Sequence, residues 1–314
     1  MKEIIFPEKR ELKGPPNIKK NGIIYPCGSE MSVFVHNGRL KYLVNHWQDF
    51  ANNIGTATVG DYETRKECKP FGGESGFYSM YYENGTTYAF GTNKNNVWIY
   101  TSKDLENWTE GRIVLTFPEN FKLFNTAVCK GDDGYRIAVE CGYEKDKNGK
   151  FMPNEYIGNG FTEFFAKSED LENWEFFPFE NAYTPQRYNA CPAMEFCDGY
   201  YYMICLEELP ALRYAPYIYR TKDFETWEIG FYNPLFVPSL EDLSPKKGVE
   251  IPQEMLNECF CHLNTNNSDI DLCEFEGKTY IVYCNGNQGN TWGGLYCEAI
   301  YDGPLAEFLK RNFE

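Results

Sequence analysis

The sequence predicts an all-β protein, a five-bladed β-propeller with four antiparallel strands in each blade. Three observations predict this fold. Aromatic residues make up 17% of the 314-residue chain, Asn-Gly and Asp-Gly pairs punctuate it, and one blade-like pattern recurs five times. Aromatic and β-branched residues favour strands, the glycine pairs favour hairpin turns, and such a repeat is typical of propellers and solenoids. No long stretch keeps apolar residues at helical spacing, so we expect short strands joined by tight turns.

The recurring motif reads Ser or Thr, one or two residues, then Asp-(Leu/Phe)-Glu-x-Trp. It stands within 101–110, 166–177 and 219–230, and weaker copies end at Thr64 and Phe308. Ser, Thr and Asp side chains accept bonds from backbone N–H groups a few residues on, so we expect them to begin a turn after an apolar strand. The Trp then opens the outer strand of each blade and packs inward.

A hairpin precedes each copy of the motif, with its turn at an Asn-Gly, Asp-Gly or Glu-Gly pair. The turn glycines are Gly38, Gly85, Gly134, Gly199 and Gly277. Hairpin, third strand and outer strand together make one four-stranded blade. We therefore expect a single domain with blades at roughly 22–70, 71–118, 119–180, 181–238 and 259–314. A sandwich of five hairpins is the weaker alternative, because sandwiches do not repeat one four-strand pattern five times.

Two stretches fall outside the repeat, 145–160 and 234–258. Long insertions on a blade face often shape binding sites, whereas solvated connectors do not, and both alternatives stay open.

The charge balance excludes two classes of partner. The chain carries 46 acidic against 30 basic residues, a net charge of −16, with no compensating basic run, so we expect neither nucleic acid nor a membrane surface as a partner. The first residues contain no apolar core of a signal peptide, and no stretch reaches the length of a membrane span. We expect a cytoplasmic protein, unless a leader has been removed.

The cysteines are expected to be reduced core thiols. Most of the twelve lie in apolar or aromatic strand-like runs, where cysteine behaves as a small buried hydrophobe. Cys259, Cys261 and His262 form the one metal-like cluster, but no second ligand pair with zinc spacing accompanies it. We therefore predict no zinc site and no cofactor.

The residues that open the innermost strands are the first candidates for a functional site, because these strands converge on the axis of a propeller. Counting eight residues back from each turn glycine gives Glu30, Phe77, Thr126, Cys191 and Asp269. The first and last blades become neighbours when the ring closes, and both place a carboxyl group at this position. The sequence therefore predicts that Glu30 and Asp269 meet at a central funnel.

Further candidates stand at strand ends and in neighbouring loops. Glu140 and Glu207 end second strands, where an acid either borders the mouth of the funnel or is solvated. Aromatic faces such as Trp47, Tyr188 and Tyr214 stack on sugar C–H surfaces, although tyrosines also fill blade interfaces. The candidates for substrate contacts are His46, Trp47, Asn125, Arg187, Asn189, Arg213, His262 and Asp271. Arginine clamps hydroxyl or anionic groups, but a surface turn or a structural histidine is the alternative in each case.

A pair of carboxyl groups at the funnel suits glycosidic bond cleavage. One group protonates the leaving oxygen, and the other activates water or attacks the sugar. Glu30 and Asp269 supply this pair, with the two second-strand acids as additional candidates. The expected partner is therefore a carbohydrate. A Ca²⁺ ion on the axis, held by Asp269 with Asn267 and Asp271, is an alternative, although the spacing matches no dedicated calcium loop.

These residues resemble those of the five-bladed propeller glycosidases of glycoside hydrolase families 43 and 32. The similarity lies in the Ser-x-Asp-Leu-x-x-Trp repeats and in second strands such as GYYYMI at Gly199, and it covers nearly the whole chain. The resemblance implies that Glu30 takes the place of the base or nucleophile of the first blade, as Glu rather than Asp. The stabilising Asp of the family would fall at Asn125–Thr126, and the general acid of family 32 within Ala190-Cys191-Pro192, where no acid stands.

Two of the three catalytic positions implied by the resemblance are thus not acidic. Either the acids have moved to Asp269, Glu140 or Glu207, or the chain binds sugar without cleaving it. We predict a glycoside hydrolase that acts on a small glycan or oligosaccharide, because two acids at a narrow axis repel unless one is protonated or both bind something. A non-catalytic carbohydrate-binding propeller and a glycoside phosphorylase, with Arg187 and Arg213 for phosphate, are the alternatives. The sugar, the linkage, the stereochemical course and the oligomeric state stay open.

Overall fold

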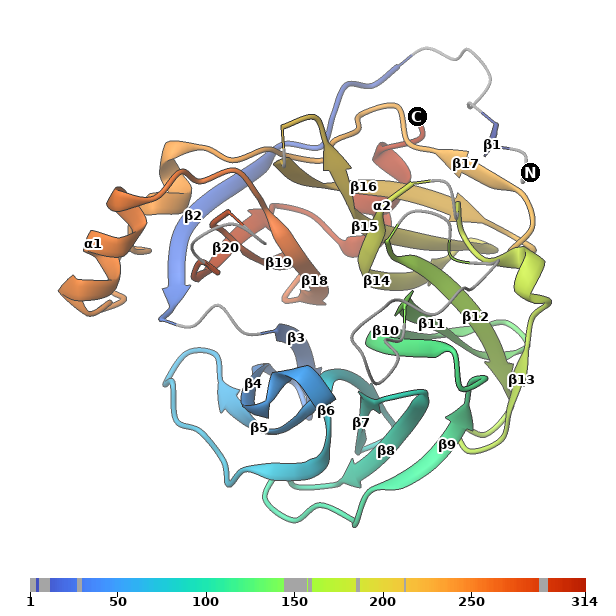
Figure 1. The fold of residues 1–314 in the computed structure, drawn as a ribbon. Coiled ribbons are helices and arrows are strands. Elements are labelled where there is room, and N and C mark those ends of the chain that lie inside the picture. Colours follow the sequence, from blue (N-terminus) through green and yellow to red (C-terminus); the bar gives the residue numbers. More distant parts are fainter. Residues whose placement is uncertain are drawn as a thin grey trace.

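The strands form sheets that stand in a ring around a central axis (Figure 1). The computed structural model describes residues 4–5, 12–26, 30–143, 157, 160–184, 187–211, 213–287 and 293–314. In this part of the chain nearly all regular structure is strand, joined by hairpin turns and accompanied by two α-helices and three 3-10 turns. The all-β prediction is confirmed.

The largest sheet has seven strands in chain order, and its members are β3 (Met31–His36), β4 (Arg39–Asp49), β5 (Ile54–Asp61), β6 (Phe71–Glu83), β7 (Thr86–Asn93), β8 (Asn96–Ser102) and β9 (Arg112–Thr116). Strand β6 is long enough to change partner along its length. Its residues Phe71 to Ser75 pair with β5, and Gly76 to Glu83 pair with β7. The sheet is therefore two four-stranded groups that share β6.

Three further sheets complete the ring. The second consists of β10 (Phe121–Gly131), β11 (Gly134–Tyr143), β12 (Thr162–Ser168) and β13 (Trp174–Phe176). The third consists of β14 (Asn189–Cys197), β15 (Tyr200–Leu209), β16 (Arg213–Thr221) and β17 (Trp227–Ile229), with the short β1 (Ile4–Ile5) parallel to its outer edge. The fourth consists of β18 (Ser268–Phe275), β19 (Lys278–Cys284), β20 (Tyr296–Tyr301) and β2 (Ile18–Tyr25).

Strand β2 closes the ring. It pairs antiparallel with β20. The N-terminal part of the chain thus supplies the outer strand of a sheet whose other three strands come from the C-terminal part. The sequence instead predicted an outer strand at the fifth motif, which ends at Phe308. That segment is helix α2 (Leu305–Arg311), which starts after Pro304 and buries Phe308 and Leu309 in the core beside β19. Because β2 already covers the edge of β20, the last segment is free to fold as a helix.

The repeated motif forms the turn that its residues predicted. Ser102 Oγ accepts from the backbone N–H of Asp104 and Leu105, and Asp104 Oδ1 accepts from the N–H groups two and three residues further on. Leu105 has φ +65°, and its carbonyl accepts from the indole N–H of Trp108 at 3.1 Å. The same hydroxyl and carboxylate contacts recur around Asp170 and Asp223, and the indole contact recurs at Trp174 but not at Trp227. In those two copies the Trp is the first residue of the outer strand, β13 or β17.

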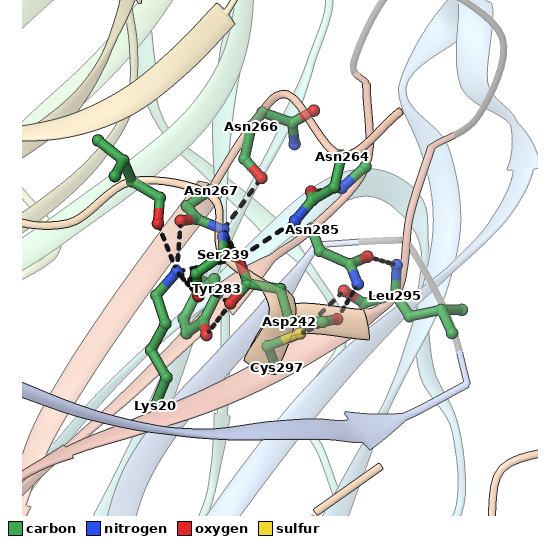
Figure 2. A network of polar contacts seen from close by, with 12 residues as sticks. Lys20, Ser239, Asp242, Asn264, Asn266, Asn267, Tyr283, Asn285, Leu295 and Cys297 are labelled. Carbon is green, nitrogen blue, oxygen red and sulfur yellow. Dashed lines mark hydrogen bonds and ion pairs between the residues drawn. The ribbon is translucent and has the colours of Figure 1, made fainter. Parts of the chain in front are cut away.

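A buried ion pair ties β2 to the segment that follows β17. Lys20 of β2 exposes 10% of its side chain and contacts Asp242, which is fully buried in the turn η3 (Leu240–Leu243), at 2.9 Å (Figure 2). Lys20 Nζ also donates to the side chain of Asn267, and Asp242 accepts from Asn267 and from the Tyr283 hydroxyl. Burial lowers the pKa of Lys20, while the Asp242 charge acts against that change.

A second buried carboxylate lies on the same strand pair. Glu298 of β20 is fully buried and accepts from Asn21 of β2, from the Tyr62 hydroxyl and from Lys246. Residues 234–258, which fell outside the repeat, therefore hold both charges of the closing strand pair through η3 and Lys246. The helix α1 (Gln253–Cys261) follows and projects from the edge of the molecule (Figure 1).

The described residues bear on two further expectations, reduced cysteines and the lack of a membrane span. The eleven cysteines among them are all free thiols, seven of them buried. None of the helices that can be described has the length and the apolar composition that crossing a membrane requires.

We predict that Asp242→Ala lowers the free energy of unfolding by about 3–5 kcal/mol, because it leaves the Lys20 ammonium buried without its carboxylate. Urea denaturation followed by circular dichroism measures the change. The double variant Lys20→Met/Asp242→Leu should regain a large part of the loss, since no charge then stays buried. Asp198→Ala, which breaks the exposed pair with Lys310, is the matched control and should leave the urea midpoint nearly unchanged. Equal stability of wild type and Asp242→Ala would contradict the prediction.

Candidate active site

A central cavity of about 430 Å³ runs between the first strands of the sheets. Its lining comes from β3, β6, β10, β14 and β18, the five strands nearest the axis. All five enter the ring from the same end, because each is followed by a hairpin to the next strand out. Side chains at the beginnings of these strands therefore gather at one mouth of the cavity.

A β-bulge marks the beginning of most inner strands. The ladder breaks between Gly76 and Ser79 in β6, and it breaks at corresponding places in β14 and β18. The first residue of each bulge has a positive φ: Phe77 at 51°, Cys191 at 53° and Asp269 at 51°. Such a backbone is strained for residues with a side chain, and bulges of this kind re-aim a side chain out of the regular alternation. The bulges thus place Cys191 and Asp269 at the mouth of the cavity, at the cost of a strained backbone.

Cys191 lies at the centre of a hydrogen-bonded group. Its thiol donates to Asp269 Oδ1 at 3.0 Å, and its backbone N–H donates to Glu140 Oε2 at 2.8 Å. The amide of Asn125 donates to the same Glu140 oxygen at 3.0 Å. The hydroxyl of Ser268 donates to Asp269 Oδ2 at 2.6 Å. Residues of three sheets are joined in this way at the cavity mouth.

Three carboxyl groups surround the Cys191 thiol. Burial raises the pKa of Cys191 far above its usual value, and the charges of Asp269, Glu140 and Glu30 raise it further. The sulfur therefore stays a neutral thiol, which donates a hydrogen bond but is a poor nucleophile. Glu30 is half-buried and lines the cavity directly before β3. Glu30 and Asp269, which the sequence predicted to meet at a central funnel, both line this cavity.

The pKa of the Glu140 carboxyl group lies near neutral pH. Burial raises its pKa to about 7, the bonds from Asn125 and Cys191 act in the opposite direction, and the Asp269 charge raises it. A carboxyl group with a pKa near 7 can exchange a proton at neutral pH, which is the property of an acid or base catalyst. Because the folded state binds this proton more tightly than the unfolded chain, Glu140 makes folding less favourable as the pH rises from 4.5 to about 7.

Two more acids line the cavity further from this mouth. Asp271 of β18 accepts from the backbone N–H groups of Val33 and Leu272, and burial raises its pKa to about 7. Glu195 of β14 has a pKa raised to about 8, first by burial and then by the Asp271 charge. The cavity therefore carries acids along its length, and the predicted substrate contact Asp271 lies inside it, deeper than Asp269.

Asn125 takes the place that the sequence assigned to Thr126. The β10–β11 turn consists of Asp132 and Asp133, and Gly134 is already the first residue of β11. Counting eight residues back from the true turn position gives Asn125 instead. Thr126 also lines the cavity, where its hydroxyl bonds to Ser79 at 2.7 Å.

Glu207 lies away from the cavity in a second polar group. Its carboxylate contacts Arg187 at 3.2 Å, and burial raises its pKa to about 7. Asn189 pairs with Glu207 across the β14–β15 ladder, and its fully buried side chain has no hydrogen-bond partner among the described residues. Arg187 therefore forms its ion pair with Glu207 and does not contact the carboxyl groups around Cys191.

The remaining four predicted contacts are not among the residues that line the cavity. Trp47 packs against Phe77 at 4.5 Å between ring centres. His46 bonds to Thr58 of the neighbouring strand, and Arg213 is exposed and donates to the Pro210 carbonyl. His262, which caps α1, contacts Glu258 at 3.1 Å. The structure does not bring these two histidines or Arg213 to the cavity.

The sequence missed three participants. Cys191 was predicted to open an inner strand, but no role was assigned to its thiol, and Glu195 was not singled out. Glu163, the direct cross-strand partner of Glu140, is fully buried with no partner for either carboxyl oxygen among the described residues. Burial raises its pKa well above the usual range, so it stays protonated. An acid inside the apolar run of β12 was the signal that could have identified it.

The donor set does not form a metal site in the part of the chain that can be described. No group of three His, Cys, Asp or Glu side chains there has the geometry to hold a metal ion. The alternative of Ca²⁺ held by Asn267, Asp269 and Asp271 requires the Asn267 side chain, which is bonded to Lys20 and Asp242 instead.

Comparisons with known proteins show the fold. The sequence matches no family model and no curated protein. Among solved structures, a putative glycoside hydrolase from Bacteroides ovatus superposes with a TM-score of 0.57 at 13% identity, over 96% of this chain and 99% of that one. An α-L-arabinofuranosidase from Podospora anserina, solved with cellotriose, gives 0.56 at 10% identity, over 95% and 94%.

The Bacteroides ovatus xyloglucan PUL protein GH43B gives a TM-score of 0.54 at 14% identity. The match covers 90% of this chain but only 53% of that one, so this chain spans about half the length of that protein. The fold is thus that of structures named as family 43 and family 62 glycoside hydrolases, which confirms the expected resemblance to family 43 propellers at the level of the fold.

We predict that Asp269→Asn lowers the pKa of Glu140 from about 7, because the Asp269 charge helps to raise it. Carbon-13 NMR of glutamate-labelled protein, assigned with Glu140→Gln, measures the titration. Asp271→Asn is the matched control: it should lower the pKa of Glu195 from about 8 and leave that of Glu140 in place. An unchanged Glu140 titration in Asp269→Asn would show that the two groups are not coupled.

Proposed function

We propose that the protein is a five-bladed β-propeller glycoside hydrolase whose reaction takes place at the Cys191 end of the central cavity. The two four-stranded groups that share β6 count as two blades, and the other three sheets supply one each. In this division the first blade takes residues Phe71 to Ser75 of β6 as its outer strand, beyond the predicted limit of 70, and residues 18–25 belong to the last blade rather than to the first.

One observation carries the functional proposal: carboxyl groups from three sheets, Glu30, Glu140 and Asp269, converge on one buried thiol at the cavity mouth. Like charges gathered in a poorly solvated place destabilise a protein, so such an arrangement is typical of catalytic sites. Glycosidic bond cleavage uses two such groups in different protonation states. The named activities of proteins with this fold, arabinofuranosidase and xylosidase, agree with the proposal.

The hydrogen bonds suggest a role for each carboxyl group. Asp269 lines the cavity mouth and is held in place by hydrogen bonds from Ser268 and Cys191, so we assign it the role of base or nucleophile. Glu30, the other carboxyl group that borders the mouth, then protonates the leaving oxygen. Glu140 lies behind them with 4% of its surface exposed and acts on Asp269 through charge rather than through contact with sugar. This assignment differs from the one implied by the family resemblance, in which Glu30 is the base.

A hydrolase is favoured over a phosphorylase by the charges around the cavity. Glu30, Asp269, Asp271 and Glu195 line it, and acids repel a phosphate ion. Neither Arg187, paired with Glu207, nor the exposed Arg213 faces this site. Water is therefore the acceptor that the described surroundings suit, and a neutral sugar is the donor.

We predict that wild-type protein cleaves at least one member of a panel of nitrophenyl glycosides and plant oligosaccharides, and that Glu30→Gln and Asp269→Asn reduce kcat/KM by about 10²–10⁴-fold. Release of nitrophenol and chromatography of products measure the rates, with circular dichroism to confirm folding. Glu208→Gln, at the exposed end of β15, is the control and should retain full activity. Sugar binding without any cleavage would favour the alternative of a non-catalytic propeller.

The assigned roles predict different responses to the leaving group. Glu30→Gln should lose little activity on dinitrophenyl glycosides, whose leaving oxygen needs no protonation, and should lose most activity on natural oligosaccharides. Asp269→Asn should lose activity on both classes, because the attack on the sugar is then unassisted. Parallel kinetics of the two variants on both substrates measure this. The reverse pattern would exchange the two roles and restore the assignment that the family resemblance implies.

A further inference from the structure

Aromatic rings form a continuous row that includes two of the inner strands, β6 and β10, together with β4, β16 and neighbouring connecting segments. In order of contact, the rings belong to Phe50, Trp47, Phe77, Phe124, Phe161, Tyr188 and Tyr214, and we refer to them as the aromatic arc. Consecutive ring centres are between 4.5 and 5.6 Å apart. The rings come from segments of the chain that are far apart in sequence, so the row is a product of the fold.

The backbone beneath the arc is shaped to hold the rings. A Cβ atom on Gly76 would collide with Trp47, and one on Gly142 would lie 2.9 Å from both Phe124 and Phe161. Both glycines have ordinary φ angles, since neither is among the positive-φ residues, so no turn explains their presence. Glycine at these two positions is explained by the close approach of the rings.

The part of the arc from Phe124 to Tyr188 lies beside the carboxyl site, and Tyr214 ends the row there. Phe124 is the direct neighbour of Asn125, which holds Glu140. Burial raises the pKa of Tyr188, and so do the charges of Cys191, Glu140 and Asp269, which places the Tyr188 ring beside the catalytic group. At the other end, Phe50 exposes 59% of its surface. The row therefore runs from the proposed reaction centre to the surface of the molecule.

Charges near the arc point to an uncharged ligand. Lys122 lies 5.3 Å from the Phe124 ring centre, but its ammonium donates to the Ala51 carbonyl. Arg187, next to Tyr188 in sequence, is paired with Glu207. With the carboxyl groups at one end and a net charge of −16, an anionic sugar such as a uronate is disfavoured.

We propose that the aromatic arc binds successive units of a neutral oligosaccharide whose reacting end lies at the carboxyl site. The proposal rests on the proposed function and extends it to the class of substrate: a chain of several sugars rather than a free monosaccharide glycoside. Sugar rings present C–H faces that stack on aromatic rings. Phe77 and Tyr214 are buried within the row, so the other five rings are the ones that can contact successive sugar units. Trp47, Phe124, Phe161 and Tyr188 are half-buried and keep part of their surface exposed, as such contacts require.

The test measures binding in the Asp269→Asn background, where substrate is not consumed. Isothermal titration calorimetry uses cello-, xylo- and arabino-oligosaccharides of two to six sugar units. Affinity should rise with chain length in one series, and Phe50→Ala should weaken binding of the longest chain by about tenfold while leaving the disaccharide unchanged. Phe260→Ala, which removes an exposed ring on α1 outside the arc, is the matched control and should change nothing.

Trp47→Ala provides a second variant nearer to the carboxyl site, and thermal unfolding shows whether its fold is intact. A role in packing alone predicts a lower Tm with the same dependence of affinity on chain length. Affinity that is independent of length in every series, or unchanged by Phe50→Ala, would overturn the proposal while leaving the hydrolase intact. Length-dependent binding by a wild type that cleaves nothing would retain the arc and reject the hydrolase.

Discussion

The pairing of β2 with β20 is the contact on which the rest of the structure depends. A ring of sheets has no edge only while its two ends are joined, and here the joint carries two buried carboxylates, one of them paired with Lys20. Buried ion pairs add little stability over apolar packing, but breaking one is costly, so they select a single register. Glu30 follows β2 by five residues, and Asp269 begins the sheet that β2 completes. The same joint therefore positions the two carboxyl groups of the proposed reaction.

The cavity mouth accumulates features that oppose stability. Acids with raised pKa values, a buried carboxyl group on Glu163 without a described partner, and positive φ angles at Cys191 and Asp269 all cost free energy. Extensive aromatic packing in the surrounding sheets offsets these costs, as in the stacked pair of Phe71 and Trp108. Unfavourable groups and backbone angles that gather at the cavity mouth are typical of a functional site on a rigid scaffold.

The parts that local chemistry determines were predictable from the sequence. The hairpin turns and the turn around Asp104 depend on residues within a few positions of one another, and the structure has them as expected. The Trp of the motif begins the outer strand at Trp174 and Trp227, whereas after Trp108 the outer strand begins only at Arg112. The placement of β2 was not predictable, because its pairing with β20 joins residues almost three hundred positions apart. The prediction for β10 was wrong by one residue, Thr126 instead of Asn125, because the turn after this strand consists of two Asp residues and the glycine follows it. The hydrogen-bonding role of Cys191 depends on Asp269 and Glu140, which lie on other sheets.

The geometry of the fold also explains how acids can change places among blades. Each inner strand begins at the same mouth, and the equivalent positions here hold Glu30, Phe77, Asn125, Cys191 and Asp269. An acid that moves from one strand to the next still faces the axis, so the chemistry can be rebuilt from a different pair of blades without altering the backbone. At 10 to 14% identity, the similarity to the solved structures shows the ring of sheets alone. In this chain Cys191 joins two of the acids, because its thiol donates to Asp269 and its backbone N–H donates to Glu140.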